Sequence, residues 1–364
     1  MNYKQKFHSV MNYEQNTDIP VVHFGYWYET VDKWKEEGHI DTDDWGKVSA
    51  KLGFDFEYGD CFGFGIANVL HPQFEPEVIE KFPDGSVHER NYEGVIELRK
   101  PGIVSIPTEI GHTLTDRASW EEHYLPKLQF SKDRYDFANL KQQAERDAPI
   151  GIYGGSLYGV LRNWFGVVGL SYITVDDEEL YDEMIAVLAN LSYDLLKYAL
   201  EKASSMGVKF DYIHFWEDIC FKTGPLVNPS VFAEKVGPYY KRITDLGKEH
   251  GIKIFSLDCD GLIDDLLPIW LENGVNTMFP IEVGTWEASI APWREKYGKK
   301  CLGIGGMNKS VFAYDFKAID AEIERLKPLV ELGGFIPCPD HRIAPDAKWD
   351  NVRYYCDKMH KVFS

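Results

Sequence analysis

The chain has no apolar run long enough to cross a membrane and no apolar leader at its N-terminus. Its opening residues, MNYKQKFHSVMNYEQ, are polar, whereas a membrane-spanning helix needs roughly 20 consecutive apolar residues. A secretory signal also requires an apolar core of about 7–15 residues near the N-terminus. We therefore expect a cytoplasmic protein with no membrane partner.

Cysteine is scarce and scattered, and positive charge is in deficit. The 364 residues include six cysteines without a CxxC pair, so we expect reduced thiols rather than disulfides. Lys and Arg number 39 against 58 Asp and Glu, which gives a net charge of −19, and no basic run is longer than Lys299-Lys300. Binding to phosphate backbones needs a basic surface, so nucleic acid is excluded as an expected partner.

A GxGxxG fingerprint is also missing, which removes support for a nucleotide-binding doubly wound sheet. From Ala148 onward, short apolar runs alternate with amphipathic stretches, as in parallel βα units. The expected strands are 149–154, 210–216, 253–257, 277–281, 301–305 and 334–337, preceded by 21–26 and one unlocated early strand. The expected helices are 178–206, 230–250, 261–273 and 315–332, and each runs into a glycine.

Eight such strands favour an α/β fold of the TIM (β/α)8 barrel type, although their spacing alone also allows an open doubly wound sheet. We expect one domain over residues 1–364, with regular βα units over about 148–364. Residues 1–147 would form an N-terminal extension. Within it, a Pro-Asp-Gly turn at 83–85 and the strand-like residues around it predict a β-meander over 81–106.

Polar side chains follow five successive expected strands. In a TIM barrel the carboxyl ends of the strands carry the active site, so these residues are candidate site residues. The candidates are Glu217, Asp258, Asp260, Glu282, Asn308 and His341. Cys259 and Cys338 lie near the same rim, and we interpret both as structural.

Several carboxylates around one cleft repel one another, and each raises the pKa of its neighbours unless a cation lies among them. Asp, Glu and His are acceptable zinc ligands. Asp258, Asp260, His341 and Glu217 are therefore both the candidate catalytic groups and a candidate metal set. The alternative is helix capping, because Asp258 or Asp260 suits the N-cap of the helix expected from Gly261.

Aromatic residues make up 14% of the chain, enough for some of them to line a cavity rather than fill the core. Tyr26 and Trp27 follow the first strand and Tyr153 lies at the end of another, where a flat ring can stack on them. We assign to substrate binding Tyr26, Trp27, Tyr153, His214, Glu282 and Asn308. His214 lies inside a strand, so packing within the barrel is its alternative role.

The C-terminal half resembles the uroporphyrinogen decarboxylase-like superfamily. The similarity rests on short motifs in the same order, namely DYIHFWED at 211–218, LDCDG at 257–261, PIE at 280–282, GGMNK at 305–309 and PDHRIAP at 339–345. It covers most of the chain from Pro149 to the end. In that superfamily a TIM barrel hosts both decarboxylases and corrinoid-dependent methyltransferases, so the resemblance implies this fold and one of these activities.

The methyltransferase branch is the more similar of the two. The decarboxylases carry an Arg-rich N-terminal segment, whereas residues 23–26 are His-Phe-Gly-Tyr, and an acidic chain is a poor host for a polycarboxylate. Related methyltransferases hold zinc with a His-x-Cys-Gly motif and a later Cys. Asp258, Asp260 and His341 take those positions here, so the resemblance implies an oxygen- and nitrogen-rich site completed by Glu217.

Together, these features predict the methyltransferase component of an O-demethylase system. It would move a methyl group from a methyl ether, with a methoxylated aromatic as the expected donor, to the cobalt of a separate corrinoid-binding protein. Zinc is the expected cofactor, and either zinc or a carboxylic acid would assist the departing oxygen. The sequence leaves the oligomeric state undecided, and a homodimer is possible.

Three alternatives also stay open. One is a uroporphyrinogen decarboxylase-like lyase. Another is a TIM-barrel glycosidase that uses Glu217 and Glu282 as a carboxylate pair. The last is a non-catalytic tetrapyrrole binder, which would retain its ligand without turnover.

Overall fold

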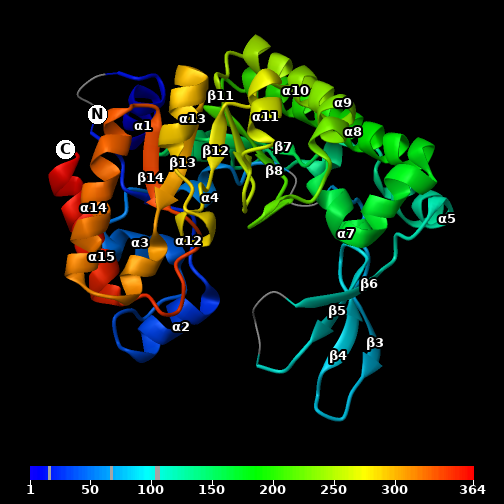
Figure 1. Cartoon of the computed structure of the whole chain (residues 1–364), viewed down its shortest axis with the longest axis horizontal. Coiled ribbons are helices and arrows are strands. Elements are labelled where there is room, and N and C mark those ends of the chain that lie inside the picture. The colour runs from blue at the N-terminus through cyan, green and yellow to red at the C-terminus, as the bar shows by residue number, and fades with distance from the viewer. Residues whose placement is uncertain (15–17, 66–68, 103–106) are drawn as a thin grey trace.

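The computed structural model describes residues 1–14, 18–65, 69–102 and 107–364. An α/β body carries an antiparallel sheet that projects from it (Figure 1). The body is built on six parallel strands in the order β14-β13-β12-β11-β8-β7. These are β7 (Gly151–Gly155), β8 (Tyr212–Trp216), β11 (Ile254–Asp258), β12 (Thr277–Phe279), β13 (Leu302–Met307) and β14 (Phe335–Pro339). Each confirms a strand expected from the sequence.

The sheet does not close into a continuous barrel within the described residues. Strands β1 (Val22–His23) and β2 (Phe56–Glu57) form a separate parallel pair. Single bridges join Tyr26 to Ile343, just beyond β14, and Phe64 to Ile152 in β7. The early segments therefore lie against both edges of the sheet without full ladders, and the expected closed (β/α)8 barrel is confirmed only as a six-stranded parallel α/β sheet.

The helices match the expectation in part. α8 (Glu178–Ser205) and α14 (Phe316–Glu331) are confirmed. The helix expected over 230–250 is two helices, α9 (Pro229–Lys235) and α10 (Gly237–Glu249), because Pro238 at the start of α10 has no backbone N–H to donate. The helix expected over 261–273 is reduced to α11 (Leu267–Glu272).

The other helices and the short strands complete the body. They are α1 (Tyr3–Met11), α2 (Tyr28–Glu36), α3 (Trp45–Leu52), α4 (Tyr58–Cys61), α5 (Arg117–Ser119), α6 (Leu140–Ala144), α7 (Gly159–Asp176), α12 (Val283–Trp286), α13 (Ile290–Tyr297), α15 (Trp349–Val362), β9 (Cys220–Phe221) and β10 (Gly224–Pro225). In the part of the chain that the structure describes, no helix combines the length and apolarity required to span a membrane.

Side chains alternate between two apolar clusters along the sheet. Tyr212 and Ile254 belong to an inner cluster that also contains Phe7 of α1. Their neighbours Ile213 and Phe255 belong to the larger cluster formed with the surrounding helices. This division follows from the strand pleat, which directs successive side chains to opposite faces.

The projecting sheet consists of β3 (Glu77–Lys81), β4 (Val87–Arg90), β5 (Val95–Arg99) and β6 (Thr108–His112) in the order β3-β4-β5-β6. It is antiparallel throughout, and it extends beyond both ends of the meander expected over 81–106. Residues 103–106 of that expectation lie outside the described residues. Every residue of β3 is exposed.

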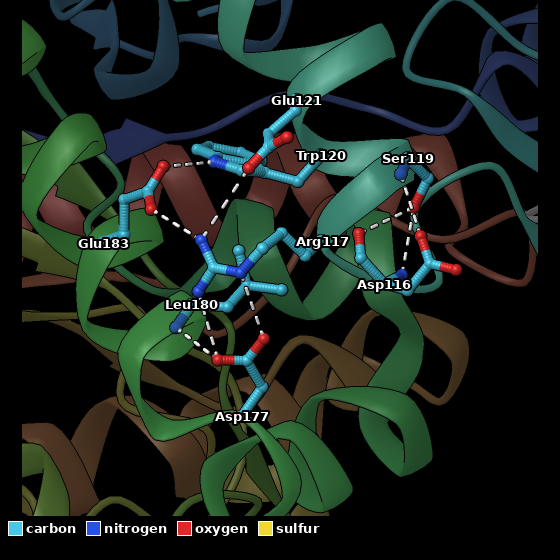
Figure 2. A network of polar contacts seen from close by, with 8 residues as sticks. All are labelled: Asp116, Arg117, Ser119, Trp120, Glu121, Asp177, Leu180 and Glu183. Carbon is cyan, nitrogen blue, oxygen red and sulfur yellow. Dashed lines mark hydrogen bonds and ion pairs between the residues drawn. The ribbon is translucent and has the colours of Figure 1, made fainter.

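A polar network ties the segment after this sheet to α8 (Figure 2). Arg117 donates to both carboxylate oxygens of Asp177, at 3.3 and 3.1 Å, and to Glu183 at 3.0 Å. The indole N–H of the buried Trp120 donates to the other oxygen of Glu183 at 2.9 Å. Asp177 also caps α8 by accepting the N–H of Leu180 at 2.9 Å. The network thus fixes the base of the sheet against the start of a long helix.

Glu217, the residue after β8, caps the start of α7. Its fully buried carboxylate accepts the N–H groups of Leu157, Tyr158 and Gly159 at 2.7, 2.9 and 2.6 Å. The hydroxyl of Tyr240 donates to the same carboxylate. A Cβ on Gly159 would lie 2.0 Å from the Glu217 carbonyl oxygen, so this close approach requires glycine. A carboxylate is favoured here because helix N-termini present unpaired N–H donors.

Replacing Glu217 by Gln should lower the free energy of unfolding by about 3 kcal/mol, because one amide oxygen leaves buried N–H groups without an acceptor. Urea unfolding followed by circular dichroism measures this change. Glu282→Gln is a matched control at another strand end, where the carboxylate accepts the single backbone N–H of Gly261, and it should cost about 1 kcal/mol. Equal losses in the two variants would contradict the capping role.

Candidate functional site

A cavity of about 1340 Å³ lies at the carboxyl ends of β8, β11 and β14. Small-molecule sites usually measure about 300–1,000 Å³, so this cavity has room for an aromatic ring and part of a second reactant. The strand ends contribute Trp216, Asp218, Asp258, Asp260 and His341 to its wall. The N-terminal segments contribute Phe24, Trp27, Trp45, Glu57 and Phe62.

The structure brings part of the expected site together and leaves part of it out. The expected residues that line the cavity are Asp258, Asp260, His341, Trp27, Tyr153 and His214. The expected residues that are absent from its lining are Glu217, Glu282, Asn308 and Tyr26.

Glu217 was expected to be a metal ligand or proton donor, and this expectation is wrong. Its carboxylate is occupied by the N-terminus of α7 and Tyr240. Burial raises the pKa of Glu217, whereas its hydrogen bonds with Tyr240 and the backbone lower it. The pleat explains the placement, because Trp216 points into the cavity and the next side chain must point away.

Glu282 and Asn308 stabilise loops instead of contacting the cavity. Glu282 accepts the N–H of Gly261 at 2.6 Å and the hydroxyl of Thr285 at 2.9 Å. Asn308 accepts the N–H of Ser310 at 3.1 Å at the start of a short 3-10 helix. Both residues were expected to contact the substrate, but the structure shows them capping loops instead. The glycosidase alternative loses its carboxylate pair, because neither Glu217 nor Glu282 lines the cavity.

Tyr26 is a core residue. It is completely buried, and its hydroxyl lies 2.9 Å from Ser49 Oγ. Trp34 and Trp45 each make an edge-to-face contact with its ring, with centroids 5.7 Å apart. The expected stacking of a substrate ring on Tyr26 is therefore corrected to packing between α2 and α3.

Asp258 and Asp260 carry the unusual electrostatics of the cavity. The Asp258 carboxylate has no hydrogen bond to any described residue, and burial, followed by repulsion from Asp260 and Asp218, raises its pKa. Burial, followed by repulsion from Glu282 and Asp218, raises the pKa of Asp260 to about 8. Asp260 is therefore mostly protonated at pH 7. Helix capping, the alternative role for both, is wrong because α11 begins only at Leu267.

His341 lies beside Asp260 at the rim. Its Nε2 is 3.9 Å from Asp260 Oδ2, and its ring stacks on Trp27 with centroids 5.6 Å apart and planes 16° apart. Burial, with a smaller effect from Lys309, lowers the pKa of His341 to about 4. At neutral pH the two side chains are therefore neighbouring uncharged groups rather than an ion pair.

The expected zinc ligands do not fit a zinc ion. Within the described residues, no group of three or more His, Cys, Asp or Glu is arranged to hold a metal. Glu217 is turned into the α7 cap and is not one of the three protein ligands, at about 2 Å, that a catalytic zinc takes. Asp258, Asp260 and His341 are available as acid–base and hydrogen-bonding groups.

His214 lies in the floor of the cavity. It is 1% exposed, its Nδ1 lies 3.0 Å from Ser256 Oγ, and its ring stacks on Phe62 with centroids 3.8 Å apart. Burial lowers its pKa to about 3. The imidazole is therefore neutral at physiological pH.

Sequence reasoning missed Asp218, Glu57 and Arg342, all of which line the cavity. Asp218 is held by Arg162, which donates to its carbonyl at 2.8 Å and to its carboxylate at 3.2 Å. The sequence did contain a signal for Asp218. Residues at every second position of a strand share one face, so Asp218 is expected on the same face as His214, four positions earlier. Glu57 and Arg342 come from irregular segments without such a pattern.

The two cysteines near the strand ends, Cys259 and Cys338, do not line the cavity, whereas Cys61 does. Cys259 and Cys338 are buried. The Sγ of Cys259 accepts the N–H of Ile219 at 3.4 Å. All six thiols are unpaired, as expected from their spacing.

Comparison with known proteins adds a fold-level likeness. No protein-family model and no curated protein matches the chain. A solved B12-independent methionine synthase from Shewanella sp. W3-18-1 shares 12% identity over 95% of this chain and 98% of its own, with a TM-score of 0.48. A methyltransferase from Methanosarcina mazei shares 13% identity over the full length of both chains with a TM-score of 0.60. The chain therefore has the fold of that methyltransferase.

Proposed function

We propose that the protein transfers a methyl group from a methyl ether, with a methoxylated aromatic as the preferred donor, to the cobalt of a corrinoid carried by a partner protein. The observation that carries the proposal is the Asp260 carboxyl in the wall of a large, aromatic-lined cavity, where burial and neighbouring carboxylates raise its pKa. The fold shared with a methyltransferase supports methyl transfer in general.

The reaction needs an acid because its leaving group is poor. The C–O bond of the ether breaks and the oxygen keeps its electron pair, while the cobalt(I) of the corrinoid supplies the pair for the new bond to the methyl carbon and becomes cobalt(III). Protonation of that oxygen as the bond breaks lowers the barrier, and a positioned acid typically contributes about 10²–10⁴-fold in rate. Asp260 supplies the proton, and water returns one to the carboxylate afterwards.

The cavity wall suits a flat donor. Trp27, Tyr153 and Phe62 present apolar ring surface to it, on which a methoxylated ring can stack. His341 fixes the plane of Trp27 by stacking on it. Because this stack adjoins Asp260, a ring held against Trp27 brings its ether oxygen toward the acid.

The crowding of carboxylates keeps the acid protonated. Burial is the largest cause of the raised pKa of Asp260, Glu282 and Asp218 raise it further, and Lys309 offsets these effects only partly. A protonated carboxyl in a partly desolvated cavity is a stronger hydrogen-bond donor to an ether oxygen than water is. The acidic surroundings are therefore part of the proposed mechanism.

Methyl transfer is tested by mixing the purified protein, a reduced corrinoid protein and methoxylated aromatics, with cobalt methylation followed by absorbance. Asp260→Asn should lower kcat by about 100-fold or more, because the acid is lost. Asp265→Asn, an exposed carboxyl further along the same loop, is the matched control and should act like the unsubstituted protein. Failure to methylate cobalt with any methyl ether would contradict the proposal, and tight corrinoid retention without turnover would favour a non-catalytic binder.

The pH dependence of the same reaction reports on Asp260. Its raised pKa of about 8 means that the acid is present at neutral pH and lost as the pH rises through 8. Single-turnover rates should therefore be level near neutrality and fall about tenfold per pH unit above the inflection. Asp260→Asn should remove the inflection and Asp260→Glu should retain one. An identical inflection in Asp260→Asn would assign it to another group.

A further inference from the structure

His214 lies at the end of a buried hydrogen-bond relay. Strands β8 and β11 pair in register, with His214 opposite Ser256. Tyr58 donates its hydroxyl proton to Ser256 Oγ at 2.8 Å, and Ser256 Oγ lies 3.0 Å from His214 Nδ1. Ser256 is completely buried.

The relay determines which nitrogen of His214 carries the proton. Ser256 Oγ already accepts from Tyr58, so its own proton needs an acceptor. Within the described residues, His214 Nδ1 is the acceptor in reach. Nδ1 of the neutral ring therefore accepts, and the ring proton resides on Nε2.

The Nε2–H group of His214 is available to a ligand in the cavity. His214 is buried but lines the cavity, and its Nε2 makes no hydrogen bond to a described residue, in contrast to Nδ1. The ring cannot readily turn away, because Phe62 stacks on it and Phe279 meets it edge-on with centroids 5.9 Å apart. A fixed donor without a protein acceptor is suited to a ligand oxygen.

The neutral state of His214 restricts what that oxygen can be. Arg146 and Arg342 also line the cavity, and Arg146 is paired with Asp60. Burial lowers the pKa of His214 to about 3, so its ring offers a ligand a hydrogen bond but no charge. An uncharged acceptor oxygen suits such a donor.

We propose that His214 is a specificity-determining residue that donates its Nε2–H to an uncharged acceptor oxygen, such as a ketone or aldehyde carbonyl, on the ring of the methyl donor. The inference rests on the proposed function for the identity of the ring. It selects methoxylated aryl ketones or aldehydes over methoxylated alkylbenzenes.

Matched ligands isolate this hydrogen bond. Methoxyacetophenone and ethylmethoxybenzene have nearly the same shape, and the ketone oxygen is the main difference between them. Titration of the ortho, meta and para isomers, followed by tryptophan fluorescence, should show at least one ketone binding roughly tenfold tighter than its ethyl analogue.

Two variants test the role of His214 in this preference. His214→Phe keeps a ring against Phe62 but removes the donor, so the ketone and its ethyl analogue should bind equally. His214→Gln keeps an N–H donor and should restore part of the preference. A preference that survives in His214→Phe, or no binding of any isomer to the unsubstituted protein, would overturn the inference.

The tautomer is measured independently of methyl transfer. Long-range ¹H–¹⁵N correlation spectra of protein labelled at histidine, assigned with His214→Gln, should show a neutral His214 with its proton on Nε2 at pH 7. Ser256→Ala should populate the other tautomer. A proton on Nδ1 in the unsubstituted protein would overturn the inference, whereas ketone preference without methyl transfer would overturn the proposed function alone.

Discussion

The site depends on one geometric constraint, the alternation of side chains along parallel strands held in register. β8 and β11 pair His214 with Ser256 and Trp216 with Asp258, and these inward side chains form successive layers beneath the cavity. Ile213 and Phe255 alternate with them and pack against the helices. A shift of one residue would exchange the two faces and place Glu217 in the cavity and Asp218 among the helices.

The buried carboxyl groups at the ends of these strands differ in the number of hydrogen-bond donors that reach them. Glu217 receives three backbone N–H groups and a tyrosine hydroxyl, so its oxygens are fully satisfied. Asp258 receives no such donors from the described residues, and the Asp260 carboxyl lies 3.9 Å from His341 Nε2. Desolvation without donors raises the pKa of such carboxyls. The contrast separates a structural carboxylate from groups available for chemistry.

The sequence predicted each of the six strands of the sheet, within an expected eight-stranded barrel, because each strand is a short apolar run that ends in polar residues. It did not predict that β1 and β2 are only two residues long, since their pairing depends on segments far apart in the chain. The helix expected from Gly261 fails because that residue has a φ of +86°, outside the range of a right-handed helix. Pro268 then lies at the start of the shorter α11.

The candidate site was predictable where a strand pattern controls it. Asp258, Asp260 and His341 follow strands, and they line the cavity. Glu217 was misassigned although the alternation through His214 and Trp216 pointed to Asp218. Tyr26 was misassigned for a different reason, because Trp34 and Trp45 bury it from helices that the strand pattern does not describe.

Under the proposed function, the polar groups that meet the donor are uncharged until the C–O bond breaks. His214 is neutral because it is buried, and Asp260 is protonated because it is buried among carboxyls. A neutral methoxylated ring therefore enters without separating charge. Once Asp260 gives up its proton, it becomes an anion facing Asp218 and Glu282, and that repulsion favours rapid reprotonation. The same crowding that makes Asp260 an acid at neutral pH thus restores it for the next turnover.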